Sequence, residues 1–182
     1  RRSRRVLCAD LRGRGLSQHD PDWKNYHPGT YVGDIAVLLK DAGVSKVVIL
    51  GTSLGGILAM VVAATTPQVL AGVILNDVGP EVAAEGLKRI STYVGKSAPV
   101  SSCAEAAAQS RHTYGLAWAG AKDQDWLGFA KRSYTIVDGV PRLAMDPMIG
   151  EAVRAAPAGA APDLWPVFGA LQPIPTLALR GA

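Results

Sequence analysis

The segment around residues 47–64 constrains the fold of this chain more than any other. A short run rich in valine and isoleucine, residues 47–50, ends in Gly51-Thr52-Ser53-Leu54-Gly55-Gly56 and leads directly into a second apolar run. The first run is too short for a helix and predicts a buried β-strand. The second run, residues 57–64, stops just before Pro67, and proline cannot continue a helix. The pattern therefore predicts a strand, a sharp turn and a buried helix.

The pattern Gly-x-Ser-x-Gly between a strand and a helix is typical of a nucleophile elbow, in which a serine occupies a strained turn. Gly51 and Gly55 leave room for the turn and for close packing of the helix on the strand. Ser53 would then expose its hydroxyl at the helix start, where the N–H of Leu54 and the helix dipole favour a developing oxyanion. The alternative is a glycine-rich turn without chemistry. A dinucleotide-binding loop is excluded, because its fingerprint needs glycine where Ser53 stands.

Composition limits the remaining possibilities. With 182 residues, 48% of them hydrophobic and 19% charged, the chain has the size and composition of one globular domain, with or without an insertion. It contains no apolar run of membrane-spanning length and no signal-peptide pattern, so we expect no membrane partner. Cys8 and Cys103 lie far from each other and from any histidine at metal-ligand spacing. We therefore expect no metal or cofactor, a buried Cys8, and free thiols in the cytoplasm, with a single disulfide as the alternative.

The net charge of +4 is concentrated at the start of the chain, where six arginines fall within fourteen residues. A basic arm for nucleic acid is one interpretation, and a solvated loop before the first strand is the other. No aromatic residues alternate with the arginines and no nucleic-acid motif follows them. We therefore expect no nucleic-acid partner.

Strand and helix patterns alternate up to residue 80. Strands are predicted at residues 6–9, 46–50 and 72–75, and helices at residues 30–42 and 57–64, the first capped by Thr30 and ended by Gly43. Asp10, after the first strand, is expected to hold the following loop by accepting N–H or arginine bonds, and the alternative is that it orients polar groups near a site. Uniformly apolar strands separated by helices indicate a parallel sheet covered on both faces.

Residues 81–171 are alanine-rich and predict four or five short helices in a second layer without further sheet. Helix starts are marked by a capping box at Ser102 and Glu105, by Asp123, by Asp146-Pro147 and by Asp163. Asp138-Gly139 indicates a turn between them. The strand pattern returns at residues 175–181.

Four segments in this order resemble the serine-dependent α/β-hydrolases: residues 10–17 (DLRGRGLS), 51–56 (GTSLGG), 75–80 (LNDVGP) and 177–181 (LALRG). The resemblance implies an α/β fold with a mostly parallel sheet of about eight strands, flanking helices and an inserted helical lid. Residues 1–80 would form the first part of the core, 81–171 the lid and 172–182 a further core strand. Ser53 would be the nucleophile, activated by a histidine that a carboxylate orients. Serine at this position argues against haloalkane dehalogenases and epoxide hydrolases, which have aspartate there.

The chain also departs from the family pattern. In that family, a His-Gly loop comes before the part of the fold that starts here at residue 1. An acid, and then a histidine, come after the strand that ends here at residue 181. We therefore expect an internal fragment that is incomplete at both ends, inactive by itself, and poorly soluble because of an unpaired sheet edge. Asp77 is a candidate acid, or a structural aspartate in its turn. His112 is expected on the lid surface or in its pocket, and His19 and His27 in solvent.

The resemblance implies hydrolysis of a carboxylic ester, lactone or thioester, or of a carbon–carbon bond next to a ketone, through an acyl-enzyme on Ser53. Leu54 would supply one oxyanion donor, and the partner would be a small acyl substrate. The aromatic residues of the lid either line an acyl pocket or pack the lid: Tyr93, Trp118, Trp126, Tyr134 and Trp165. The alternative function is a small-molecule-binding protein on the same fold, without rapid turnover. The oligomeric state has no signature in the sequence.

Overall fold

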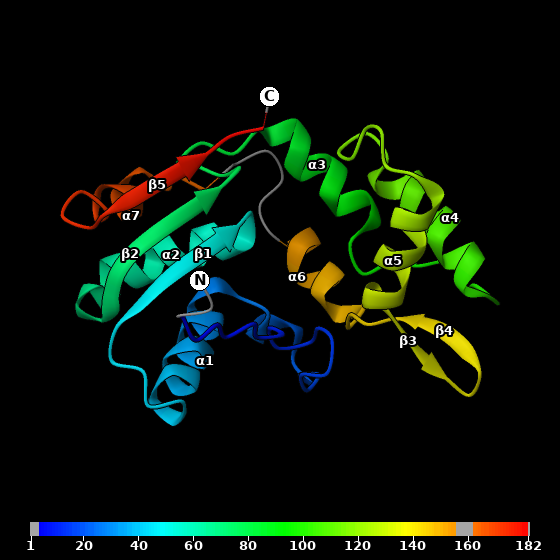
Figure 1. Ribbon diagram of the computed structural model, residues 1–182, viewed down its shortest axis with the longest axis horizontal. Helices are drawn as coiled ribbons and strands as arrows, with labels where there is room; N and C mark the ends of the chain where they lie inside the picture. Colours follow the sequence, from blue (N-terminus) through cyan, green and yellow to red (C-terminus); the bar gives the residue numbers. More distant parts are fainter. Residues whose placement is uncertain (1–3, 156–161, 182) are drawn as a thin grey trace.

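A three-stranded parallel sheet organises one half of the molecule (Figure 1). Its strands follow the order β1 (Val47–Thr52), β2 (Leu70–Asn76) and β5 (Thr176–Leu179). The structure is a computed structural model and describes residues 4–155 and 162–181. The register pairs Ile49 with Val73, and Val73 with Thr176. The predicted α/β class with a parallel sheet is confirmed, and within the described residues the sheet is open.

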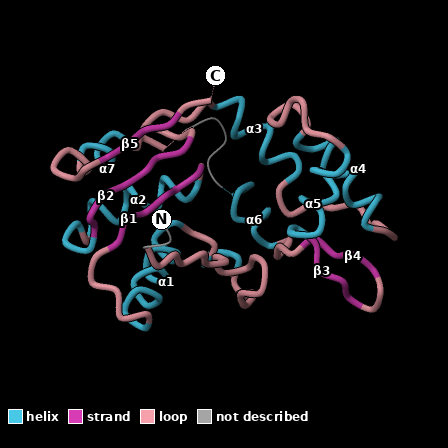
Figure 2. Tube along the Cα trace, viewed as in Figure 1, coloured by secondary structure: helices cyan, strands magenta, loops and turns pink. Residues whose placement is uncertain are grey.

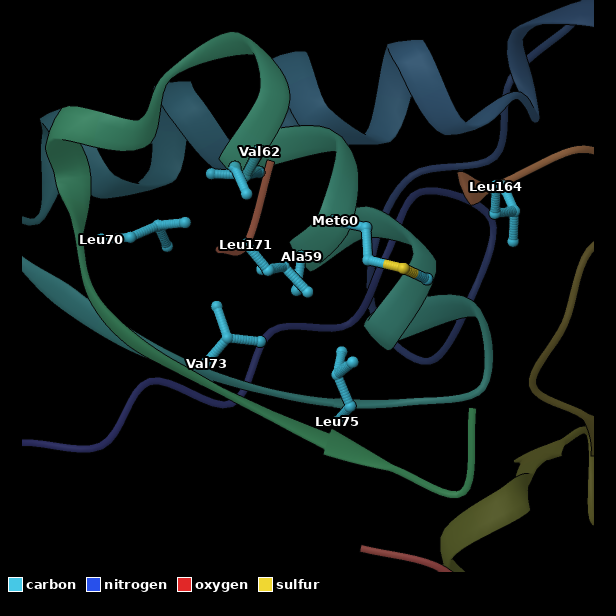
Figure 3. Close-up of a cluster of buried hydrophobic side chains, with 9 residues drawn as sticks. Ala59, Met60, Val62, Leu70, Val73, Leu75, Leu164 and Leu171 are labelled. Atoms are coloured by element: carbon cyan, nitrogen blue, oxygen red, sulfur yellow. The ribbon is translucent and has the colours of Figure 1, made fainter. Parts of the chain in front are cut away.

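Helices cover one face of this sheet. They are α1 (Pro28–Asp41), α2 (Leu54–Thr65) and α7 (Trp165–Gly169), with short 3₁₀ turns η1 (Trp23–Asn25) and η2 (Pro67–Val69). Figure 3 shows side chains of α2 and β2 pointing toward one another across the core. The buried members of this core are Ala59, Met60, Val62, Ala63, Leu70, Val73, Leu75, Leu164 and Leu171. Leu164 and Leu171 flank α7, so this part of the chain packs with the sheet although the sequence groups it with the lid.

The opposite face of the sheet carries exposed apolar side chains. Strand alternation places Val48 and Leu50 of β1 and Leu177 and Leu179 of β5 on this face, and all four are exposed. The sequence predicts cover on both faces, and the described helices cover only one. None of the described helices is long and apolar enough to cross a membrane.

The other half of the molecule is a helical layer, which we define as residues 84–155 (Figure 1). It contains α3 (Ala84–Tyr93), α4 (Cys103–Tyr114), α5 (Asp123–Ser133), β3 (Tyr134–Val137), β4 (Val140–Leu143) and α6 (Met148–Ala155). Helices α4 and α5 pack around a small core of their own: Val100, Ala106, Ala107, Trp126 and Ala130. The predicted cap of α4 is present, because the Ser102 hydroxyl accepts the Glu105 N–H at 3.2 Å.

The antiparallel hairpin of β3 and β4 shows that the prediction of no further sheet in residues 81–171 is wrong, although the turn of this hairpin was predicted. Asp138 and Gly139 have φ angles of 50° and 77°, the left-handed pair that a two-residue hairpin turn requires. The flanking residues are a short mixture of apolar and polar side chains, and only the pairing of the two segments makes them strands.

The predicted strand at residues 6–9 is wrong. These residues form no ladder with another described strand, and Figure 2 shows the start of the chain as loop. Val6 is 76% exposed, and Cys8 is exposed rather than buried. An apolar run becomes a strand only when a neighbouring strand completes its backbone hydrogen bonds, and that neighbour is not visible in the local sequence. Helix α1 also begins earlier than expected, at Pro28, because the Nδ1 atom of His27 caps it.

Candidate active site

Ser53 stands in a strained backbone conformation between β1 and α2. Its φ of 51° and ψ of −117° lie in a region that residues other than glycine rarely adopt. The side chain is exposed, and its hydroxyl makes no capping bond to α2. Leu54 is the first residue of α2, so its N–H has no acceptor within the helix. An exposed hydroxyl and a free N–H therefore lie side by side at the positive end of a helix.

Two glycines allow this turn. A Cβ atom on Gly51 would come within 3.0 Å of backbone atoms of Gly55 and Gly56, so only glycine lets α2 approach β1 this closely. A Cβ on Gly56 would meet the side chain of Val78. At Gly55, in contrast, a Cβ atom would meet no described atom within 4 Å apart from its chain neighbours and the backbone of its own helix. Of the two glycines in the Gly-x-Ser-x-Gly pattern, the described structure therefore requires Gly51 but not Gly55.

Ser53 lines a cavity of about 530 Å³. Asp10 and Arg14 of the first loop, which we define as residues 10–27, also line this cavity. Asp10 accepts the Leu16 N–H at 3.0 Å, and its backbone carbonyl accepts the Ser17 hydroxyl at 2.7 Å. Asp10 thus holds the loop by accepting an N–H, as predicted.

Asp77 occupies the position on β2 that corresponds to Ser53 on β1. Thr52 and Asn76 are paired in the sheet, and the residue after each has a positive φ, 51° at Ser53 and 53° at Asp77. The exposed Asp77 carboxylate accepts the Gly181 N–H at 3.3 Å, while its own N–H donates to Leu179 at 2.8 Å. These bonds join the ends of β2 and β5. They favour the structural interpretation of Asp77 over the catalytic one.

The three histidines lie at other places in the fold. His27 caps α1, and exposed His112 lies on α4. The side chain of His19 is 58% exposed, with Nδ1 at 3.5 Å from a carboxylate oxygen of Asp146. Within the described ranges, no hydrogen bond joins a histidine to Ser53 or to Asp77. The same ranges contain no group of three histidine, cysteine, aspartate or glutamate side chains that could hold a metal ion.

A buried polar junction connects the first loop with the helical layer. The Tyr26 hydroxyl donates to the carboxylate of Asp146 and accepts the Asp20 N–H at 2.8 Å. Asp146 in turn accepts the Met148 N–H at 2.9 Å, and its own N–H donates to the Gly13 carbonyl at 2.8 Å. Tyr26 is 7% and Asp146 5% exposed. The sequence predicted the cap at Asp146 but not its tyrosine partner.

An ion-pair network reinforces the same loop. The Arg12 guanidinium donates two bonds to Asp34, at 3.0 and 2.7 Å, and a third to Asp20. These bonds, with Asp34 as the larger contributor, raise the pKa of Arg12. The Asn25 amide, the Asp22 N–H and Arg12 together lower the pKa of the Asp20 carboxyl. The first loop is therefore held in one conformation by charge-assisted hydrogen bonds.

The junction predicts a stability loss at high pH. Burial, followed by the hydrogen bond to Asp146, raises the pKa of Tyr26 from 10.0 to about 12. The folded state therefore holds this proton more tightly than the unfolded state. The contribution is complete below about pH 10 and is lost as the pH rises toward 12. We expect the free energy of unfolding, measured by urea titration, to fall more steeply over this range in the natural protein than in a Tyr26→Phe variant. Equal slopes would contradict the assignment.

Known proteins are similar to this chain in sequence and in the fold described above. The family model for the alpha/beta hydrolase fold matches residues 1–130 of the 182. The chain belongs to this family. A solved alpha/beta hydrolase from Novosphingobium aromaticivorans is 40% identical and superimposes with a TM-score of 0.85, over 94% of this chain and 61% of that one. The present chain therefore covers less than two thirds of the length of that relative.

Two curated relatives match shorter segments of this α/β-hydrolase. A 3-hydroxybutyrate-oligomer hydrolase of Cupriavidus necator is 38% identical over 91 residues, which are 50% of this chain and 31% of the relative. An sn-1-specific diacylglycerol lipase of Mus musculus is 36% identical over 80 residues, or 44% of this chain and 25% of the relative.

Proposed function

We propose that the intact protein is a serine hydrolase that cleaves a carboxylic ester, lactone or thioester through an acyl-enzyme on Ser53. One observation carries the proposal: an exposed, unbonded serine hydroxyl in a strained turn, beside the free N–H of Leu54 at the start of α2. Strain of this kind costs about 1–3 kcal/mol and persists where the surrounding fold enforces it, most often at functional sites.

In the proposed reaction, the Ser53 oxygen attacks the carbonyl carbon while its proton passes to a base. The carbonyl oxygen becomes an oxyanion, which the Leu54 N–H and the helix dipole stabilise. The alcohol or thiol leaves with a proton, and water then attacks the acyl-enzyme and releases the acid. We propose a histidine as this base; within the described residues, no hydrogen bond joins His19, His27 or His112 to Ser53. Asp77 stays a candidate for the acid that orients the base, and its bond to the Gly181 N–H favours a structural role.

The names of the two curated relatives support ester chemistry. One name describes hydrolysis of 3-hydroxybutyrate oligomers and the other a lipase for diacylglycerol. Both substrates contain carboxylic esters with aliphatic acyl groups. We therefore place an aliphatic carboxylic ester ahead of a lactone or thioester as the substrate class of this protein.

Labelling with a fluorophosphonate probe tests the proposal, because such probes modify serines that act as nucleophiles. We expect the intact protein to be labelled. Labelling should disappear in a Ser53→Ala variant, because alanine has no hydroxyl oxygen to form the covalent bond with the probe. A Ser45→Ala variant is the matched control, because Ser45 is an exposed serine just before β1. A well-folded protein that resists the probe would favour the small-molecule-binding alternative.

A further inference from the structure

A second cavity, of about 440 Å³, lies between the first loop and the helical layer. We refer to it as the layer cavity. Its walls come from residues 10–15, from the ends of α3 and β4, and from facing sides of α4 and α5. It shares Asp10 and Arg14 with the cavity that Ser53 lines. Arg14 therefore stands at the place where the two cavities adjoin.

The lining of the layer cavity has an excess of positive charge. The lining includes three residues with cationic side chains, Arg14, Lys96 and Arg132, and a single carboxylate, that of Asp10, which already accepts the Leu16 N–H. Among the described residues, no carboxylate oxygen lies within 4.0 Å of any of the three cations.

Arg14 differs in this respect from Arg12, two residues earlier. The guanidinium of Arg12 is bonded by Asp34 and Asp20. Among the described residues, the guanidinium of Arg14 has one hydrogen-bond partner, which is uncharged: it donates to the hydroxyl of buried Tyr31 at 3.0 Å and lies 5.5 Å over the ring. Arg14 is therefore positioned by Tyr31 while its charge is not neutralised.

Part of the uncharged polar lining of the layer cavity is already hydrogen-bonded around Gln109. The side-chain oxygen of Gln109 accepts from Ser97 at 2.9 Å and from the Tyr134 hydroxyl at 2.6 Å, and its amide donates to the Ala98 carbonyl at 3.0 Å. These bonds hold Gln109 in place and leave its side chain little remaining capacity for a ligand. The charged groups in excess in this cavity are the three cationic side chains, and an anion is complementary to them.

We propose that the layer cavity is a subsite for the carboxylate of an anionic ester, held by Arg14, Lys96 and Arg132. This inference rests on the proposed ester hydrolysis at Ser53 and names its substrate class: esters that also carry a free carboxylate, such as linear hydroxyacid oligomers. The reacting ester lies at Ser53, the chain passes Arg14, and the charged end reaches Lys96 and Arg132. A neutral ester gains nothing from these cations.

The test compares two substrates that differ by one charge, the linear dimer of 3-hydroxybutyrate and the methyl ester of that dimer. Release of 3-hydroxybutyrate from the internal ester by the intact protein gives kcat/KM for each. In a Lys96→Gln/Arg132→Gln variant we expect kcat/KM for the dimer to fall about tenfold, the effect of losing about one charge-assisted hydrogen bond, and kcat/KM for the methyl ester to stay within about twofold. Lys131→Gln is the control, since exposed Lys131 precedes Arg132 on α5 but does not line the cavity.

Equal losses for both substrates, or no loss for the dimer, would overturn the subsite. Hydrolysis of 4-nitrophenyl butyrate separates this from failure of the proposed function. If the intact protein hydrolyses neither the butyrate nor the two dimers, the proposed function fails, and calorimetric titration with the 3-hydroxybutyrate dimer decides the subsite alone. Binding that weakens about tenfold in the double variant, but not in Lys131→Gln, supports it, and absence of binding overturns it.

Discussion

Replacing Gly51 with alanine should destabilise the protein by at least about 3 kcal/mol and abolish labelling of Ser53 by a fluorophosphonate. The added Cβ would lie within 3.0 Å of the Gly55 carbonyl and the Gly56 nitrogen, which are backbone atoms of the first turn of α2. A flexible side chain can move away from such a collision, but a helix turn moves only with the whole helix. Helix α2 is buried against β2, so its displacement disrupts the core as well as the turn at Ser53.

Gly55→Ala is the matched control for Gly51→Ala. Both changes add one methyl group to a glycine of the same pattern, two residues on either side of Ser53. At Gly55 the methyl meets no described atom within 4 Å apart from its chain neighbours and the backbone of its own helix, and alanine is favoured over glycine in a helix. We expect Gly55→Ala to change the free energy of unfolding by less than about 1 kcal/mol, in the stabilising direction, and to keep Ser53 reactive. Urea unfolding and probe labelling measure both outcomes, and equal effects of the two substitutions would contradict the argument.

The contrast between these glycines shows what the sequence could predict. Strand β1, the turn at Ser53 and helix α2 were predicted because their residues are contiguous and each local preference agrees with the others. The cap at Ser102 and the turn at Asp138 were predictable for the same reason. The sequence pattern treats the two glycines alike, and only the packing of α2 on β1 distinguishes them.

The missed features depend on residues that are far apart in the chain. Tyr26 and Asp146 are separated by 120 positions, and nothing near either residue indicates the other. Arg12 and Arg14 are similar in sequence context, and the partners of Arg12 on the loop and α1 give the two arginines different roles. The run at residues 6–9 has the composition of a strand, but its state depends on a neighbouring strand that local sequence does not specify.

Replacing Asp146 with alanine should cost about 3 kcal/mol of unfolding free energy, the second large effect that we expect. The substitution leaves the buried Tyr26 hydroxyl without its acceptor and removes the cap of α6 at Met148. A buried donor that loses a charged partner costs about 1–3 kcal/mol, and a lost cap adds about 1 kcal/mol. Asp163→Ala is the control, because exposed Asp163 caps the short helix α7 through the Trp165 N–H at 3.0 Å and has no other described partner. It should cost about 1 kcal/mol or less.

The Asp146→Ala substitution should loosen one region of the molecule rather than the whole fold. Asp146 lies between β4 and α6, and the neighbouring backbone bonds, Gly15 to Ala144 and Asp146 to Gly13, hold the first loop against the helical layer. Hydrogen exchange should therefore quicken in α6 and the first loop of Asp146→Ala, while amides of α2 and β2 remain protected. Gly15 and Ala144, which are joined beside this junction, line the layer cavity, so loosening the junction should also reduce the preference for the anionic dimer over its methyl ester. If exchange quickened uniformly through α2 and β2 instead, Asp146 would support the whole fold, and its role as the connection between loop and helical layer would be wrong.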